Sequence, residues 1–168
     1  YGPKGSWVGG REKAPAAFCR KVAVAKLSGD PSIDIWGDGE QTRSFCYIDD
    51  CVLGLMKLMA SDFHDPLNLG SDRMVNMNEL VGIIAGIADT QVEIGHIEGP
   101  QGVRGRNSDN TLLRKVLRWE PEISLEKGLG ITYRWIEALV RDTLDHAPDR
   151  KKAIEELRES RIYQAPCT

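Results

Sequence analysis

The sequence predicts a small α/β or α+β unit in which helices of ordinary length alternate with very short strands. Four stretches carry apolar residues at helical spacing, and the β-prone runs between them are two to five residues long. Two loops combine arginine with glycine, at 36–50 and 99–110. The strands are too few and too short for an independent doubly wound sheet. No G-x-G-x-x-G opens a β-α unit, so the sequence predicts no dinucleotide site of its own.

Composition indicates a soluble globular protein. The chain has 168 residues, of which 41% are hydrophobic and 28% charged. A net charge of −3 gives no reason to expect nucleic acid or an anionic membrane as a partner. Its cysteines (Cys19, Cys46, Cys51 and Cys167) form no C-x-x-C pair and have no histidine at ligand spacing. We therefore expect no metal site, reduced thiols and a cytoplasmic location.

A glycine-rich loop opens the chain and ends in the charged cluster Arg11–Lys13. The chain starts at Tyr1 without an initiator methionine, and we interpret it as a fragment of a longer protein. Pro15 suits the first turn of a helix, where its missing N–H costs nothing. Apolar residues then recur at helical spacing, and Gly29 and Pro31 stop the pattern, which predicts a helix over 14–27.

The stretch 36–50 is the first unusual loop. A strand over 33–36 leads into the turn Gly37–Gly39, and the polar run Gln41–Arg43 follows. A guanidinium at such a turn can form a bidentate fork on phosphate or carboxylate. A β-prone run over 44–48 comes next, and we expect Asp49 or Asp50 to cap the following helix.

Further elements follow from periodicity. The residues Val52, Leu55, Met56 and Met59 predict a helix over 49–60 with this face buried in the core. Short strands are expected at 66–69, 75–77 and 92–97. Between the last two, Asn76 or Asn78 is placed to cap a helix.

The stretch 99–110 is the second unusual loop, and it places backbone N–H groups beside Arg104 and Arg106 in a composition suited to an anion. A short helix over 111–117 follows, and Ser124 is expected to cap a long helix. Beyond 145 the sequence is charged and predicts a solvated helical tail. We therefore divide the chain into 1–145, the binding portion, and 146–168, the tail.

Several motifs together resemble the carboxyl-terminal part of the extended short-chain dehydrogenase/reductases. These are Tyr1–Pro3, the stretch 36–50, Asn68–Gly70 and Leu117–Pro121. The stretches 9–21 and 102–110 resemble the GDP-mannose 3,5-epimerase family more specifically, and the resemblance covers about 1–136. It implies an α/β fold that is the substrate-binding portion of such an enzyme, with the NAD-binding Rossmann half largely missing.

The resemblance also implies a reaction. Bound NAD removes hydride from C4 of GDP-D-mannose, proton exchange follows at C3 and C5, and the returning hydride gives GDP-L-galactose and GDP-L-gulose. Such an enzyme is a cytoplasmic homodimer of ascorbate biosynthesis. The residues that bind NAD are expected upstream of Tyr1, so this fragment alone is predicted to be inactive.

The site residues implied by the resemblance come from four stretches. Lys13 would be the catalytic acid/base, and this chemistry needs an amine that can give up its proton, through burial or a nearby positive charge. Substrate binding is assigned to Glu12, Lys13, Ala14, Lys21, Gln41, Thr42, Arg43 and Arg106. For Arg11 and Arg104 we expect loop salt bridges. Arg118 departs from the family, where a glycine is expected at the end of a helix.

Two alternatives stay open. The chain resembles other nucleotide-sugar epimerases, decarboxylases and dehydratases of the superfamily, although the R-E-K-A-P run at 11–15 favours the first interpretation. A non-catalytic nucleotide-sugar-binding module is the other alternative.

Overall fold

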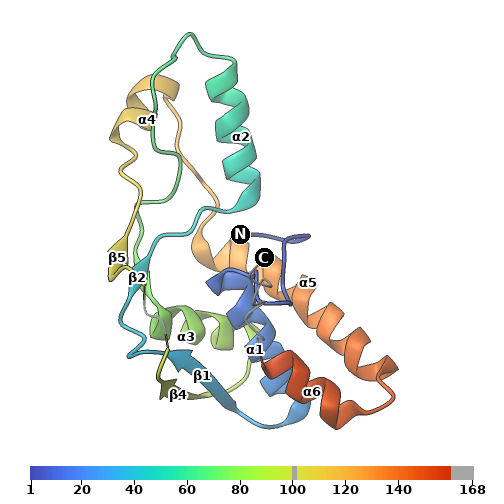
Figure 1. Cartoon of the computed structure of the whole chain (residues 1–168). Coiled ribbons are helices and arrows are strands. Elements are labelled where there is room, and N and C mark those ends of the chain that lie inside the picture. The colour runs from blue at the N-terminus through green and yellow to red at the C-terminus, as the bar shows by residue number, and fades with distance from the viewer. Residues whose placement is uncertain (100–101, 160–168) are drawn as a thin grey trace, which may run out of the picture.

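The computed structural model describes residues 1–99 and 102–159 (Figure 1). Its helices are α1 (Ala14–Ser28), α2 (Ile48–Met59), α3 (Met77–Ala88), α4 (Thr111–Leu117), α5 (Leu125–His146) and α6 (Arg150–Arg158). Its strands are β1 (Ser32–Trp36), β2 (Thr42–Arg43), β3 (Val75–Asn76), β4 (Glu93–Ile97) and β5 (Gly105–Arg106). The predicted α/β class is confirmed. Among the helices described, none combines the length and apolar character needed to cross a bilayer.

The strands form two small sheets. β1 pairs in parallel with β4, with Ser32 opposite Glu93. The other sheet has the order β3-β2-β5, in which β2 runs antiparallel to β3 and parallel to β5. Sequence positions 42–43 and 105–106 thus become neighbours, and the two arginine-glycine loops meet there.

One hydrophobic core holds the lower part of the molecule together. α1 packs against α3, α5 and β1, and α6 covers the end of this cluster (Figure 1). Fully buried aliphatic side chains at its centre are Val22, Val24, Ile33, Leu80, Ile84, Leu129, Ile136 and Val140. At about 1.5–3 kcal/mol for each buried aliphatic side chain, this cluster supplies most of the stabilisation of the fold.

Local signals set the ends of these helices as predicted. Pro15 lies in the first turn of α1, and Gly29 ends that helix in the left-handed conformation with φ of 77°. The Asn76 side chain accepts a hydrogen bond from the Glu79 amide at 2.7 Å, which caps α3. Ser124 caps α5 in the same way, through the Lys127 amide at 3.2 Å.

The predicted burial of the α2 face is wrong. Its apolar side chains are Val52, Leu55, Met56 and Met59, which are 47, 48, 62 and 85% exposed. α2 projects away from the main core (Figure 1). The 3.6-residue period defines an apolar face, and what covers that face is a separate matter that the period does not determine.

Two predicted strands are also wrong. Neither 44–48 nor 66–69 is a strand: 44–47 has no regular structure and Ile48 already begins α2. Within the described residues neither run pairs with a neighbouring strand. Tyr47, not Asp49 or Asp50, is the N-cap of α2. The buried Asp50 carboxylate instead accepts a hydrogen bond from the Ile123 amide at 2.8 Å and holds the turn before α5.

The predicted solvated tail is helical in its described part, but one side of it is packed. Ala153 and Leu157 of α6 are 8 and 7% exposed. The Arg158 guanidinium pairs with the Asp30 carboxylate and fastens α6 to the end of α1. Residues 160–168 of the predicted tail lie outside the described residues.

Arg118, which departs from the family at a helix end, has φ of 48° and caps α4 in the left-handed conformation. A glycine would adopt this conformation with less strain.

Candidate nucleotide-sugar site

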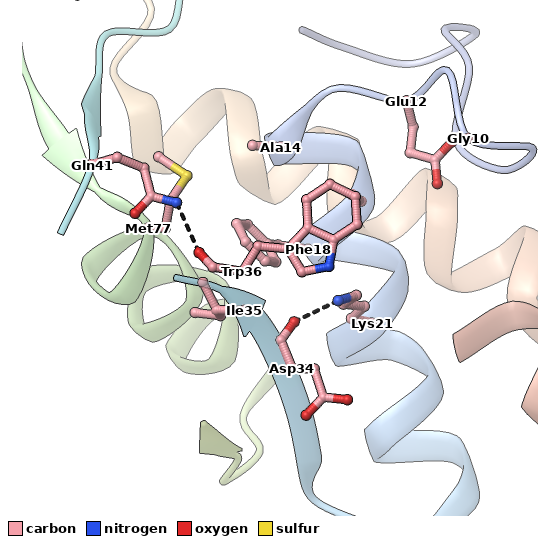
Figure 2. Close-up of a pocket in the computed structure, with 11 residues that line it drawn as sticks. Gly10, Glu12, Ala14, Phe18, Lys21, Asp34, Ile35, Trp36, Gln41 and Met77 are labelled. Atoms are coloured by element: carbon pink, nitrogen blue, oxygen red, sulfur yellow. Dashed lines mark hydrogen bonds between the residues drawn. The ribbon is translucent and has the colours of Figure 1, made fainter. Parts of the chain in front are cut away.

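A pocket of about 250 Å³ opens between the first half of α1, β1 and the start of α3 (Figure 2). Its lining combines aromatic and aliphatic walls with a few polar groups, the usual composition of a small-molecule site. The residues that line it are Gly10, Glu12, Ala14, Ala17, Phe18, Lys21, Asp34, Ile35, Trp36, Gln41 and Met77. The predicted site residues Glu12, Ala14, Lys21 and Gln41 are thus brought together.

Lys21 lies on one side of this pocket. Its ammonium group donates a hydrogen bond to the Asp34 carbonyl at 2.5 Å, which joins α1 to β1 (Figure 2). Its Nζ lies 6.0 Å from the centre of the Phe18 ring. Burial lowers the pKa of Lys21, and the nearby Asp34 carboxylate acts against this. The result is a half-buried cation that can bind an acceptor atom of a ligand.

Gln41 faces the pocket from the opposite side (Figure 2). Its side chain is 8% exposed, and its amide nitrogen donates to the Trp36 carbonyl at 3.1 Å. The amide oxygen of Gln41 is buried and has no hydrogen-bond partner among the residues described. An unsatisfied buried acceptor costs about 1–3 kcal/mol, so this atom favours a ligand that brings an N–H or O–H donor.

Glu12 reaches the pocket from the opening loop, but its carboxylate is already bound. Its Oε1 lies 2.5 Å from Nη1 of Arg20, and the two side chains are 1 and 2% exposed. Sequence reasoning missed Arg20, since an arginine inside a helical run gives no sign that it faces inward.

Lys13 occupies the N-cap position of α1, between the pocket residues Glu12 and Ala14. Its side chain is exposed and does not line the pocket. The described residues therefore do not bury this amine, and its predicted role as the acid/base stays a prediction. Arg11, two residues earlier, is exposed as well.

Thr42, Arg43 and Arg106 lie outside this pocket, on the second sheet. Arg43 of β2 stands directly opposite Arg106 of β5 in a parallel register. Neighbouring strands are ~4.8 Å apart, and paired residues project to the same face, so two guanidinium-bearing residues lie side by side. Thr42 directly follows Gln41 and links this pair to the pocket, and its amide donates to the Arg104 carbonyl at 2.9 Å.

Arg104 forms the loop salt bridge that the sequence predicts. Its Nη1 and Nη2 donate to the two carboxylate oxygens of Asp38 at 2.9 and 2.8 Å. These bonds hold the pKa of Asp38 at about 2. This bidentate pair joins the two arginine-glycine loops at the surface of the molecule.

Several pocket residues have no signal in the sequence. Phe18, Ile35 and Met77 belong to apolar faces and differ from core residues only by their position at the pocket edge. Trp36 is 37% exposed and gives the pocket a second aromatic wall. An exposed tryptophan at the end of a strand, directly before a Gly-Asp-Gly turn, is the one signal that could have identified it.

Neither a metal nor a dinucleotide fits the residues described. Within 1–99 and 102–159, no group of three metal-ligating side chains comes together. No described strand runs into a helix through a glycine-rich turn, the arrangement that holds a dinucleotide pyrophosphate. What these residues provide is a polar and aromatic pocket beside a pair of arginines.

Comparison with known proteins shows which class of enzyme the chain resembles. The sequence model of the NAD-dependent epimerase/dehydratase family matches residues 1–70. UDP-glucose 4-epimerase of Thermotoga maritima, solved with UDP-glucose, superimposes with a TM-score of 0.74 at 28% identity over 83% of this chain and 44% of its own. Over its first 70 residues the chain is therefore similar to the NAD-dependent epimerase/dehydratase family.

Similarity within the family is more specific. The chain is 57% identical over 137 residues to GDP-mannose 3,5-epimerase 1 of rice, Oryza sativa, which is 82% of this chain and 35% of the relative. UDP-glucuronic acid decarboxylase 5 of Arabidopsis thaliana is 36% identical over 109 residues, 64% of this chain and 32% of that protein. The predicted resemblance is confirmed. The chain spans about a third of the length of these relatives.

Proposed function

We propose that this chain is the substrate-binding portion of a GDP-mannose 3,5-epimerase, which converts GDP-D-mannose to GDP-L-galactose and GDP-L-gulose. The observation that carries the proposal is the convergence of Glu12, Ala14, Lys21 and Gln41 on one pocket, beside the Arg43–Arg106 pair. The 57% identity to the rice enzyme supports this substrate over that of the more distant decarboxylase.

Each part of the site suits one part of a nucleotide diphosphate sugar. Lys21 can donate to an acceptor and the Gln41 oxygen can accept from a donor, so together they suit a group with both kinds of polar atom. The aromatic walls Phe18 and Trp36 suit a planar or ring-shaped group. Arg43 and Arg106 can each form a charge-assisted bond to a pyrophosphate oxygen, and Thr42 lies between them and the pocket.

In this proposal Lys13 is the acid/base that exchanges a proton with the sugar ring. Lys13 is the N-cap of α1 and lies in sequence between two pocket residues, so its flexible side chain can reach a sugar bound there. The family uses NAD for the hydride step. We infer that NAD is held by a part of the enzyme outside this chain, since the described residues do not fit a dinucleotide.

We infer in addition that the complete enzyme is a homodimer working in the cytoplasm in ascorbate biosynthesis. The free cysteines Cys19, Cys46 and Cys51 are compatible with a reducing compartment. Size measurement of the natural protein would test the oligomeric state, cell fractionation the location, and the ascorbate content of cells lacking the protein the pathway.

The function can be tested in a chimera in which this chain replaces the segment of rice GDP-mannose 3,5-epimerase 1 that it matches. We expect the chimera to epimerise GDP-mannose and the variant Lys13→Ala to lose at least about 10²-fold in kcat, since an acid/base contributes roughly that much. GDP-mannose binding should stay within a few fold, because the amine acts on the reacting C–H bond.

Lys127→Ala is the matched control, since Lys127 is exposed near the start of α5, away from the pocket. It should leave kcat unchanged. Retained turnover in Lys13→Ala, with a large loss of binding, would refute the acid/base role. An unmodified chimera that binds UDP-glucuronate in preference to GDP-mannose would favour the decarboxylase alternative, and one that binds without turnover would favour a binding module.

A further inference from the structure

Arg20 is a buried cation behind the wall of the pocket. It lies on α1 and is 1% exposed. Its Nη1 donates to the Glu12 carboxylate at 2.5 Å and to the Trp7 carbonyl at 2.7 Å. One nitrogen therefore binds the opening loop at two points that are five residues apart in the sequence.

The loop between these two points reverses direction. Gly9 and Gly10 have φ of 89° and 80°, a left-handed conformation that a residue with a side chain adopts only with strain. Gly10 lines the pocket, and Lys13 follows Glu12 directly. Arg20 thus closes the base of the loop 8–11, which forms one edge of the pocket and leads into Lys13.

Stability alone gives a weak reason for this pair. Burying two charges carries a desolvation cost that their attraction often only balances, and apolar replacements of such pairs are commonly neutral or stabilising. The cost is increased here, because Nε and Nη2 of Arg20 have no hydrogen-bond partner among the described residues. What the pair does provide is a fixed position for a segment that has no helix or strand of its own.

We propose that Arg20 is a positioning residue of this site. By holding Trp7 and Glu12 together, it fixes the loop 8–11, the pocket edge at Gly10 and the approach of Lys13 to the sugar. Arg20 itself touches no substrate. The proposal rests on the function proposed above, because the position of Lys13 matters only if Lys13 acts on the sugar.

Three variants separate positioning from folding: Arg20→Met, Glu12→Gln and the double variant. Arg20→Met leaves the Glu12 carboxylate buried without its partner, so we expect a lower melting temperature. The double variant removes both charges and should recover most of that loss. It does not restore the bond to the Trp7 carbonyl, so the loop stays untethered.

We therefore expect kcat of the chimera to remain at least about tenfold low in the double variant, since small misplacements of catalytic groups are costly. The KM for GDP-mannose should change less than kcat. Trypsin provides a readout on the full 168-residue chain that needs no activity, because Arg11 and Lys13 are exposed cleavage sites in or beside the loop. Cleavage there should be faster in Arg20→Met and in the double variant than in the unchanged chain.

Recovery of kcat together with the melting temperature in the double variant would overturn the proposal, and so would unchanged cleavage at Arg11 and Lys13. If the chimera with the unchanged chain has no epimerase activity, the proposed function fails and the proposal for Arg20 falls with it. If that chimera is active and the double variant recovers fully, only the proposal for Arg20 fails.

Discussion

Single side chains in this protein acquire their roles from the partners that the fold gives them. Lys13, Lys21 and Lys127 cannot be ranked by residue type, and the family resemblance singles out the first two. The structure then separates these two, with Lys21 half-buried against Asp34 and Lys13 exposed at the N-cap of α1. Sequence reasoning could not have found Arg20, because its importance arises from a loop that folds back over it.

The pair Asp38 and Arg104 gives a prediction at this scale. Arg104→Gln should raise the pKa of Asp38 from about 2 toward its ordinary value near ~3.9, since the lowered pKa comes first from hydrogen bonds to Arg104. A lowered carboxyl pKa contributes stability above ~pH 4 that is lost as pH falls toward 2. The variant should therefore lose less stability than the unchanged chain over that interval.

Carboxyl chemical shifts followed by NMR between pH 1.5 and 6 would measure this, with the range chosen to bracket both values. Arg114→Gln is the control, because the ion-pair partners of Arg114 are Asp72 and Glu120. A pKa of Asp38 that stays near 2 in Arg104→Gln would show that another group lowers it.

At the scale of elements, the sequence predicted that a helix exists better than it predicted what packs against that helix. α1 and α4 lie within a residue of their predicted bounds, and α3 and α5 begin directly after their predicted caps, Asn76 and Ser124. Capping and proline signals act through neighbouring backbone atoms, which is why the sequence locates them. The strand predicted at 66–69 failed because a strand needs a partner from elsewhere in the chain. The predicted burial of the α2 face is wrong for a similar reason, since burial also depends on which distant part of the chain packs against the helix.

The exposed face of α2 is tested by Met56→Lys. Met56 is 62% exposed, so we expect the free energy of unfolding to change by less than about 0.5 kcal/mol. Binding of the dye ANS, which reports exposed apolar surface, should fall. Leu80→Ala, at a fully buried position of α3, should cost about 2–5 kcal/mol by contrast. Urea denaturation measures both, and a loss above 2 kcal/mol in Met56→Lys would mean that the face is covered.

The whole molecule has two parts of unequal packing. α1, α3, α5 and α6 share one core with β1, whereas α2 and α4 form an arm that projects from it (Figure 1). In this arm the buried residues are Asp50 and Gly54 of α2 and Leu113 of α4. Gly54 is needed because a side chain there would meet Leu69 and Trp119.

We expect native-state hydrogen exchange to reflect this division. Amides of α2 and α4 should exchange at least about tenfold faster than those of α1 and α5, because few buried apolar contacts oppose local opening of the arm. Mass spectrometry of peptic peptides would resolve the two sets. Equal protection of α2 and α5 would show that the arm and the core unfold as one unit.

α1 serves the pocket and the core with neighbouring side chains. Phe18 and Lys21 line the pocket, Cys19 and Val22 lie in the core, and Arg20 holds the opening loop. Every position from 18 to 22 therefore has a role in folding or in the pocket. In a library that randomises this segment, many variants that change specificity would also fail to fold. A protein engineer seeking a different sugar nucleotide would do better to vary the opposite wall, at Trp36 and Gln41, and leave the helix unchanged.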